Sequence, residues 1–142
     1  RGHRVTAVEE NARAVSDAHR NLEVNRLDPR MVRLVAGRVE DVLPELGRTA
    51  CDAVVLDPPR QGCAPAVIRQ VFEGLRPARA VYVSCGPESL AAELPRIVDA
   101  GYAVSAVHAV DMFPHTPHVE AVVVFDAATA GRRRARPGQN RV

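Results

Sequence analysis

Short apolar runs rich in valine alternate along the chain with segments in which apolar residues recur every three or four positions. The first pattern is typical of buried strands and the second of helices that cover a sheet. We therefore expect an α/β fold built on a mostly parallel sheet. The predicted strands are residues 5–8, 32–35, 52–56, 79–83, 102–110 and 119–125, and the predicted helices are residues 11–26, 39–46, 65–75 and 88–100.

The last part of the pattern departs from this alternation. Strands 102–110 and 119–125 follow each other with no helix between them, so they are expected to form a closing antiparallel pair. Pro95 lies inside the predicted helix 88–100, where a proline removes a backbone hydrogen bond and should kink or restart the helix. Residues 128–142 contain no predicted element and are expected to be disordered, which leaves residues 1–127 as one domain.

The sequence Val-Ser-Cys-Gly-Pro-Glu places Cys85 on a turn between strand 79–83 and the helix that follows it. Proline and glutamate suit the first turn of a helix. A cysteine beside a helix N-terminus is favoured as the thiolate, which is the nucleophilic form. On this local evidence a nucleophile and an inert buried thiol are equally open.

The run Asp-Pro-Pro-Arg, from Asp57 to Arg60, directly follows the predicted strand 52–56. Two prolines end a strand abruptly because proline fixes φ and has no amide hydrogen. The carboxylate of Asp57 is therefore expected at the carboxyl edge of the sheet, where α/β folds bind their ligands. The alternatives are a structural role for Asp57 in the turn and, for Arg60, either phosphate binding or pairing with an acid.

A third segment brings acids, histidines and an aromatic residue beside the last strand: Asp111, Phe113, His115, His118 and Glu120. An acid next to a nucleophile can abstract a proton from a reacting group. Two histidines in a proline-rich loop are weak evidence for a metal, so we expect them to pack or to contact RNA, and no metal site is predicted. The aromatic ring is expected in the core, with base stacking as the alternative.

Together these three motifs resemble the RNA uracil-C5 methyltransferases, which use S-adenosylmethionine (SAM) to make 5-methyluridine in rRNA or tRNA. That family carries an Asp-Pro-Pro-Arg-like turn, a Val-Ser-Cys-Asn-Pro turn and an Asp-Met-Phe-Pro-x-Thr-x-His-x-Glu segment. The chain matches them, in this order, at residues 57–60, 83–87 and 111–120. The resemblance runs from about Val5 to Phe125 and implies an RNA-modifying enzyme of the cytoplasm with no membrane partner, a monomer at full length.

Carried over residue by residue, the resemblance also implies roles. Cys85 would be the nucleophile that adds to C6 of uracil, and Glu120 the base that removes the proton from C5, with Asp111 as a competing candidate. Asp57 would lie between the cofactor and the target base. Glu9, at the end of strand 5–8, would bind the ribose hydroxyls of SAM.

The fold implied is that of class I SAM-dependent methyltransferases, a Rossmann-like sheet with strand order 3-2-1-4-5-7-6. The sequence has no Gly-x-Gly pattern, and its first predicted strand ends in acids, as the second strand of such a domain does. We therefore expect a partial catalytic domain that supplies strands 2 to 7 and lacks strand 1 with its glycine-rich loop. The neighbours of that strand would then expose unpaired edges or close up on each other.

The chain departs from the family in two places. Gly86 follows the cysteine where the family has asparagine, which puts the rigidity of that turn in question. Gly37 and Arg38 stand where the family has Gly-Asp or a similar acid near the adenine, so that contact is in question too. Glu40 or Asp41 could substitute for it.

Three other functions compete with this one. RNA cytosine C5-methyltransferases carry a cysteine directly after a Pro-Pro turn, and amino-methyltransferases of the Asp-Pro-Pro-Tyr type carry an aromatic residue there. Arg60 occupies that position and argues against both. The remaining alternative is an inactive fragment of a uracil-C5 enzyme that at most binds RNA or a partner. The missing glycine-rich loop favours it, and the intact motifs oppose it.

Composition changes this picture little. The formal net charge is +2, but residues 127–142 hold five arginines and no acid, so residues 1–126 carry a net charge of −3 and no obvious basic footprint. No apolar run approaches the roughly 20 residues of a membrane span. Three cysteines without a Cys-x-x-Cys spacing fit a reducing compartment and argue against a zinc site.

Overall fold

The computed structural model describes residues 2–46, 51–116 and 118–128. The strands are β1 (Val5–Glu9), β2 (Val32–Ala36), β3 (Ala53–Leu56), β4 (Arg79–Ser84), β5 (Tyr102–Val110) and β6 (Glu120–Ala127). The helices are α1 (Ala12–Val24), α2 (Val39–Leu46), α3 (Pro65–Arg69) and α4 (Pro87–Asp99), with a 3-10 turn η1 (Pro29–Met31) and a π-helical turn η2 (Gln70–Leu75). Every predicted strand and helix is confirmed within two residues at each end. Apart from Ala128, the predicted disordered tail lies outside the described residues.

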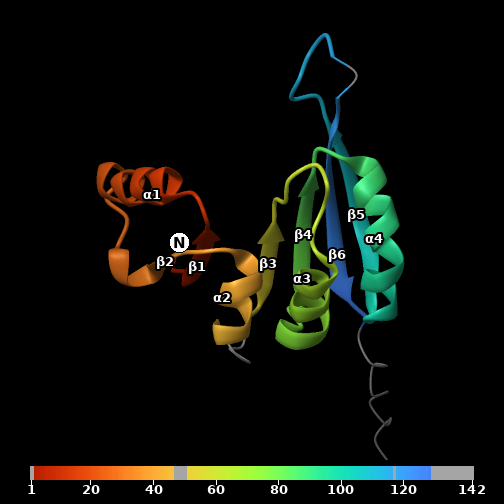
Figure 1. Ribbon diagram of the computed structural model, residues 1–142, viewed down its shortest axis with the longest axis horizontal. Helices are drawn as coiled ribbons and strands as arrows, with labels where there is room; N and C mark the ends of the chain where they lie inside the picture. Colours follow the sequence, from red (N-terminus) through yellow and green to blue (C-terminus); the bar gives the residue numbers. More distant parts are fainter. Residues whose placement is uncertain (1, 47–50, 117, 129–142) are drawn as a thin grey trace, which may run out of the picture.

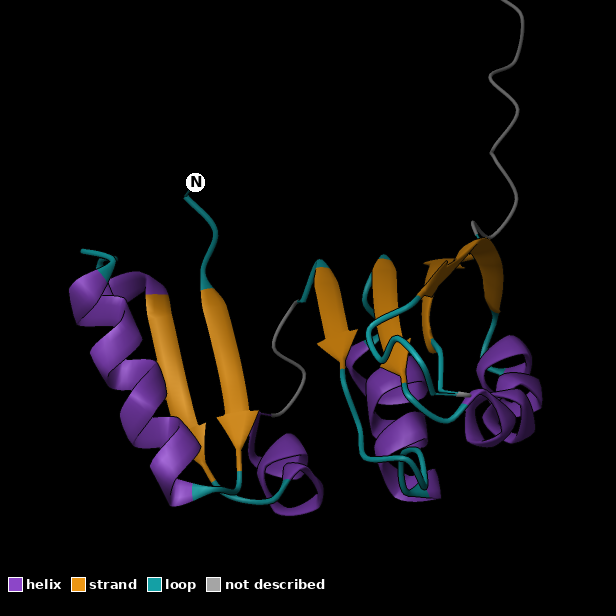
Figure 2. Cartoon of the chain, turned by 90° about the horizontal axis from the view of Figure 1, so that it is seen from above, coloured by secondary structure: helices purple, strands orange, loops and turns teal. Residues whose placement is uncertain are grey.

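The strands form two sheets rather than one (Figure 1). One sheet contains β1 and β2, paired in parallel, and the other has the order β3-β4-β6-β5. β3 and β4 are parallel, whereas β6 is antiparallel to both β4 and β5, which confirms the closing antiparallel pair. All four parallel strands point the same way (Figure 2), so their carboxyl ends share one side of the molecule.

The edges of β1 and β3 face each other without pairing (Figure 2). A sheet that lacks its central strand was expected either to expose unpaired edges or to close up, and the structure has the unpaired edges. Val5 on one edge is 48% exposed and Val55 on the other is 71% exposed.

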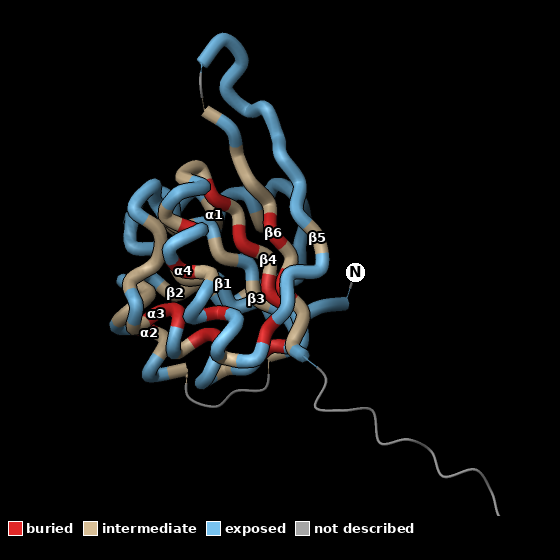
Figure 3. Tube along the Cα trace, turned by 90° about the vertical axis from the view of Figure 1, so that its right-hand side faces the viewer, coloured by how far each residue is buried: buried red, intermediate tan, exposed pale blue. Residues whose placement is uncertain are grey.

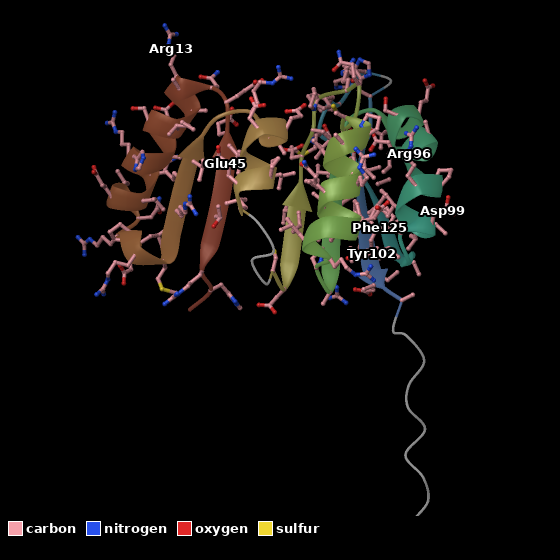
Figure 4. The ribbon with its side chains drawn as sticks, turned by 60° about the horizontal axis from the view of Figure 1, so that its bottom comes forward. Arg13, Glu45, Arg96, Asp99, Tyr102 and Phe125 are labelled. Carbon is pink, nitrogen blue, oxygen red and sulfur yellow. The ribbon has the colours of Figure 1, made fainter. Side chains whose placement is uncertain are left out.

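The buried core lies in the four-stranded sheet and the helices that cover one of its faces. Phe72 of η2 meets Tyr102 of β5 and Phe125 of β6 edge to face, with ring centroids 4.9 and 5.9 Å apart. Tyr102 and Phe125 are labelled in Figure 4. This geometry is the one aromatic rings favour when they pack. The core also contains Val67, Ile68, Val71, Ala80, Tyr82, Leu90, Ile97 and Val123. By contrast, α1 has no buried residue.

Two local expectations need correction. Pro95 was expected to kink or restart α4, and because the helix runs unbroken from Pro87 to Asp99, it does not restart there. Phe113 is 42% exposed and lies in the loop between β5 and β6, which projects beyond the rest of the molecule (Figure 3), so it is not part of the core. The described helices include none long and apolar enough to cross a bilayer.

Candidate functional site

Cys85 lies on the tight turn between β4 and α4, as expected from the sequence. β4 ends at Ser84, Gly86 is the N-cap of α4, and Pro87 is the first helical residue. The Gly86 N–H donates to Ser84 Oγ over 3.2 Å, which closes the turn around the cysteine. The Cys85 side chain is half-buried and its thiol is free of disulfides.

Glu120 is brought to the same place by the strand register. Ser84 is paired with Ala121 in the β4–β6 ladder, so Glu120, the first residue of β6, is placed beside Cys85 at the end of that ladder. Glu120 is also paired with Val110, the last residue of β5. Asp111, the competing candidate for the base, therefore lies at this end too, but it is exposed whereas Glu120 is half-buried.

Asp57 is the third residue at this edge. Leu56 of β3 pairs with Tyr82 of β4, so Asp57 emerges one position further along, next to the end of β4. Its side chain is exposed, and it begins the loop of residues 57–64 that leads to α3. The register therefore places the sequence-predicted acid, nucleophile and base at the same end of three neighbouring strands, β3, β4 and β6.

Arg60 contacts α4 through its backbone. Its carbonyl oxygen accepts a 2.7 Å hydrogen bond from Ser89 Oγ. A Cβ added at Gly86 would lie 2.5 Å from the same oxygen, so glycine is required there by close approach of two backbones. Gly86, which departs from the family pattern, is thus explained in this chain by the packing of the 57–64 loop. The guanidinium of Arg60 is exposed.

Glu93 of α4 also holds this loop. It is 6% exposed, and its Oε1 accepts from the Cys63 N–H over 2.7 Å. Its Oε2 accepts from the hydroxyl of buried Tyr82 over 2.8 Å. Burial, followed by the hydrogen bond to Glu93, raises the pKa of Tyr82 well above its usual range. Burial also raises the pKa of the Cys63 thiol to about 11, so this cysteine stays protonated at neutral pH.

Glu9 lies apart from these residues, at the carboxyl end of β1 in the two-stranded sheet. Its carboxylate is exposed, and Oε1 accepts from the Asn11 N–H over 2.7 Å while Asn11 caps α1. The structure places Glu9 on the same side of the molecule as the ends of β3 and β4, across the unpaired edges (Figure 2). Arg38, the second departure from the family, forms a 3.6 Å ion pair with Glu40.

The loop between β5 and β6 supplies no metal site within the described part of the chain. No group of three or more histidine, cysteine, aspartate or glutamate side chains is found there that could hold a metal. The ring of His118 lies 6.4 Å from that of Phe113, edge to face, while His115 is exposed at a backbone φ of 68°. Neither histidine therefore belongs to a group of possible metal ligands among the described residues.

Sequence reasoning missed Ser89 and Glu93. A signal for Glu93 was present, because it shares a helical face with the core residues Leu90 and Ile97 and is the one acid at such a position in the described part of α4. A charged residue on a buried helical face is a sign of a specific partner. Neither partner, Cys63 N–H or Tyr82 OH, could be identified without the fold.

The sequence profile of the tRNA (uracil-5-)-methyltransferase family matches residues 2–128. An uncharacterized RNA methyltransferase of Gloeobacter violaceus is 41% identical over 122 residues, which are 86% of this chain and 25% of that protein. Another, from Caldanaerobacter subterraneus, is 41% identical over 124 residues, which are 86% of this chain and 27% of that protein.

Solved structures extend the similarity at the level of fold. An rRNA methylase from Streptococcus thermophilus superposes with a TM-score of 0.67 at 12% identity, over 88% of this chain and 74% of that one. A precorrin-6y C5,15-methyltransferase from Geobacter metallireducens gives 0.66 at 19% identity, over 87% of this chain and 68% of that one. The chain has the class I SAM-dependent methyltransferase fold, and it spans about a quarter of the length of the curated relatives it matches.

Proposed function

Because the chain belongs to the tRNA (uracil-5-)-methyltransferase family, we propose that Asp57, Cys85 and Glu120 take part in methylation of C5 of a uridine in RNA. The observation that carries the proposal is that the β3–β4 and β4–β6 registers bring all three residues to the same end of the strands. The RNA is rRNA or tRNA, and the methyl donor is SAM.

The chain offers part of a SAM site. Glu9 Oε1 accepts a hydrogen bond from the Asn11 N–H, whereas Oε2 has no hydrogen-bond partner among the described residues. Oε2 can therefore accept hydrogen bonds from the ribose hydroxyls. Asp57 offers a second exposed carboxylate across the unpaired edges. When bound there, SAM supplies an electrophilic methyl group on a sulfonium.

The chain's own residues account for the rest of the reaction. The Cys85 thiolate adds to C6 of uracil, so an S–C6 bond forms and C5 gains the electron density of an enolate. C5 could then take the methyl group that SAM would supply, with the neutral thioether S-adenosylhomocysteine as the leaving group. Glu120 removes the C5 proton, the C5–C6 double bond forms again, and the Cys85 thiolate leaves.

The test uses tRNA and rRNA transcripts made with 5-fluorouridine in place of uridine, incubated with SAM and the protein. Fluorine cannot leave as a proton does, so a methylated adduct between RNA and Cys85 should accumulate and survive denaturation. The band should disappear in Cys85→Ala and persist in Cys51→Ala, whose thiol is placed just before β3, at the opposite end of that strand from Asp57. A band that survives in Cys85→Ala would refute the role of this cysteine.

A second candidate is binding of RNA or SAM without turnover. The observation that favours it is the division of the sheet between β1 and β3, which separates Glu9 from the other site residues. Retained SAM binding by equilibrium dialysis together with no adduct would support this candidate. An adduct would exclude it.

A further inference from the structure

The face of α4 that packs on the hydrophobic core also contacts the loop of residues 57–64. Gly86, Ser89 and Glu93 are spaced three and four residues apart, so they lie along one side of the helix and its N-cap. Each contacts the loop: Gly86 by close approach to the Arg60 carbonyl, Ser89 by a hydrogen bond to that carbonyl, and Glu93 by its bond to the Cys63 amide.

Glu93 is the most informative of the three. A carboxylate that is only 6% exposed costs free energy to bury, and in the described part of the chain it has no ion pair to offset that cost. Two hydrogen bonds offset it instead, one from Tyr82 of β4 and one from the Cys63 backbone in the loop. An apolar side chain at this position could accept a hydrogen bond from neither group.

The loop is shaped to receive this carboxylate. Gly62 has φ +80°, which side chains rarely adopt, and a Cβ added there would overlap Glu93 Oε1. The Gly62 N–H donates to the Pro59 carbonyl over 2.8 Å, which turns the chain so that the next amide, that of Cys63, points to Glu93. Loop and helix are therefore fitted to each other at a part-buried polar contact.

We propose that Glu93 is a positioning residue, which fixes the 57–64 loop against α4 and so sets Asp57, at the start of the loop, relative to Cys85, just before the helix. The role rests on the proposed function, because it concerns the geometry of that reaction. Glu93 touches neither RNA nor SAM in this role. It acts through its hydrogen bond to the Cys63 amide.

The test compares three variants. Glu93→Ala removes the acceptor for both donors, Glu93→Gln keeps an acceptor for the Cys63 amide, and Tyr82→Phe removes one donor while the bond to the loop remains. Tyr82→Phe controls for lost stability, because it also breaks a buried hydrogen bond. Each variant is first checked by its urea midpoint, and all rates are measured where it is fully folded.

Two readouts are used. Hydrogen exchange measures how fast the Gly62 and Cys63 amides exchange with solvent. The 5-fluorouridine adduct assay with tRNA and rRNA transcripts measures the maximal rate of adduct formation and the RNA concentration that gives half of it. We expect Glu93→Ala to speed exchange at both amides and to lower the maximal rate by about tenfold or more, with the half-saturating concentration little changed. Glu93→Gln and Tyr82→Phe should stay within about threefold of the unaltered protein in rate.

The outcomes separate the two proposals. No adduct from the unaltered protein overturns the uracil-C5 function and, with it, the positioning role. A normal adduct from the unaltered protein with an equal maximal rate in Glu93→Ala overturns only the role of Glu93. Equal losses in Glu93→Ala and Tyr82→Phe also overturn it, because they point to stability rather than to the loop. Should Glu93→Ala fail to fold, an unimpaired maximal rate in Ser89→Ala together with fast exchange at the Arg60–Cys63 segment would overturn it in the same way.

Discussion

Ser84 at the end of β4 pairs with Ala121 of β6, and the residues that follow one and precede the other are Cys85 and Glu120. The strand register fixes where side chains lie at the end of a ladder, because a slip of one residue would turn every side chain of the strand to the other face. A thiol and a carboxylate brought together in this way can act on the same small group.

The first prediction concerns Glu120→Gln. The amide cannot accept the C5 proton, so addition of Cys85 and methyl transfer should still occur while release of Cys85 should slow by roughly 10²–10⁴-fold. A covalent species should therefore accumulate even with ordinary uridine in the RNA. Mass spectrometry of the protein after nuclease digestion would detect a methylated nucleotide on Cys85.

Asp111→Asn is the matched control, since Asp111 lies at the same end of the β5–β6 pair and is exposed. It should give no accumulation. If Asp111→Asn traps the adduct and Glu120→Gln does not, the base has been assigned to the wrong acid.

The second prediction concerns the turn at Gly62. Gly62→Ala should lower the free energy of unfolding by about 2 kcal/mol or more, because alanine is strained at φ +80° and its Cβ would overlap the Glu93 carboxylate. Gly74→Ala is the control, since a Cβ there meets nothing within 4 Å. It should change stability by less than about 1 kcal/mol. Urea unfolding measures both, and equal effects would contradict the tight fit of the loop on α4.

The third prediction concerns stability at high pH. The ordinary pKa of a cysteine is 9.0, and burial raises that of Cys63 to about 11, while that of Tyr82 is raised above its ordinary 10.0. The unfolded chain therefore loses these protons at lower pH than the folded chain. The stability that the neutral groups contribute is complete below about pH 9 and is lost as pH rises towards 11.

Urea midpoints measured in reductant from pH 8 to pH 11 would test this. The midpoint should fall less steeply with pH in Cys63→Ala than in the unaltered protein, because one of the two groups that gain protons on folding has been removed. An unchanged slope would show that the Cys63 thiol ionises as readily in the folded protein as in the unfolded one.

The fourth prediction concerns the two sheets. Within residues 2–46 only Val42 is buried, whereas the core cluster is drawn from residues 67–125. A two-stranded sheet with little buried surface opens easily. Amides of β1 and β2 should therefore exchange with solvent at least about 100-fold faster than those of β4 and β6. Equal rates in both sheets would show a single cooperative unit.

Much of the fold could be predicted because its elements are strongly periodic. The valine-rich strands and the amphipathic helix 11–26 follow simple rules of spacing, and the structure has them with small shifts at their ends. The helix α4 does not restart at Pro95, because its contacts with α3 and β5 outweigh the loss of one backbone hydrogen bond. Phe113 was misjudged because an aromatic residue in a loop carries no periodicity that reports burial.

The residues of the site were predictable to different extents. Asp57 and Cys85 follow predicted strands closely and Glu120 lies at the start of one, so a parallel sheet closed by an antiparallel strand places all three at one end of the strands. Glu93 could not be predicted in its role, because its partners come from a strand and a loop, 11 and 30 residues away in sequence. Contacts of this kind depend on how elements pack and not on the pattern within any one of them.

The three contacts between the 57–64 loop and α4 restrict how this protein can change over evolutionary time. Surface loops ordinarily accept insertions and deletions at small cost. Here the Arg60 carbonyl and the Cys63 amide are held by residues at fixed positions on a rigid helix, so an added residue between them would pull one of the two from its partner by roughly 3.5 Å. Among descendants of this sequence, the spacing between positions 60 and 63 should therefore vary less than the side chains found there.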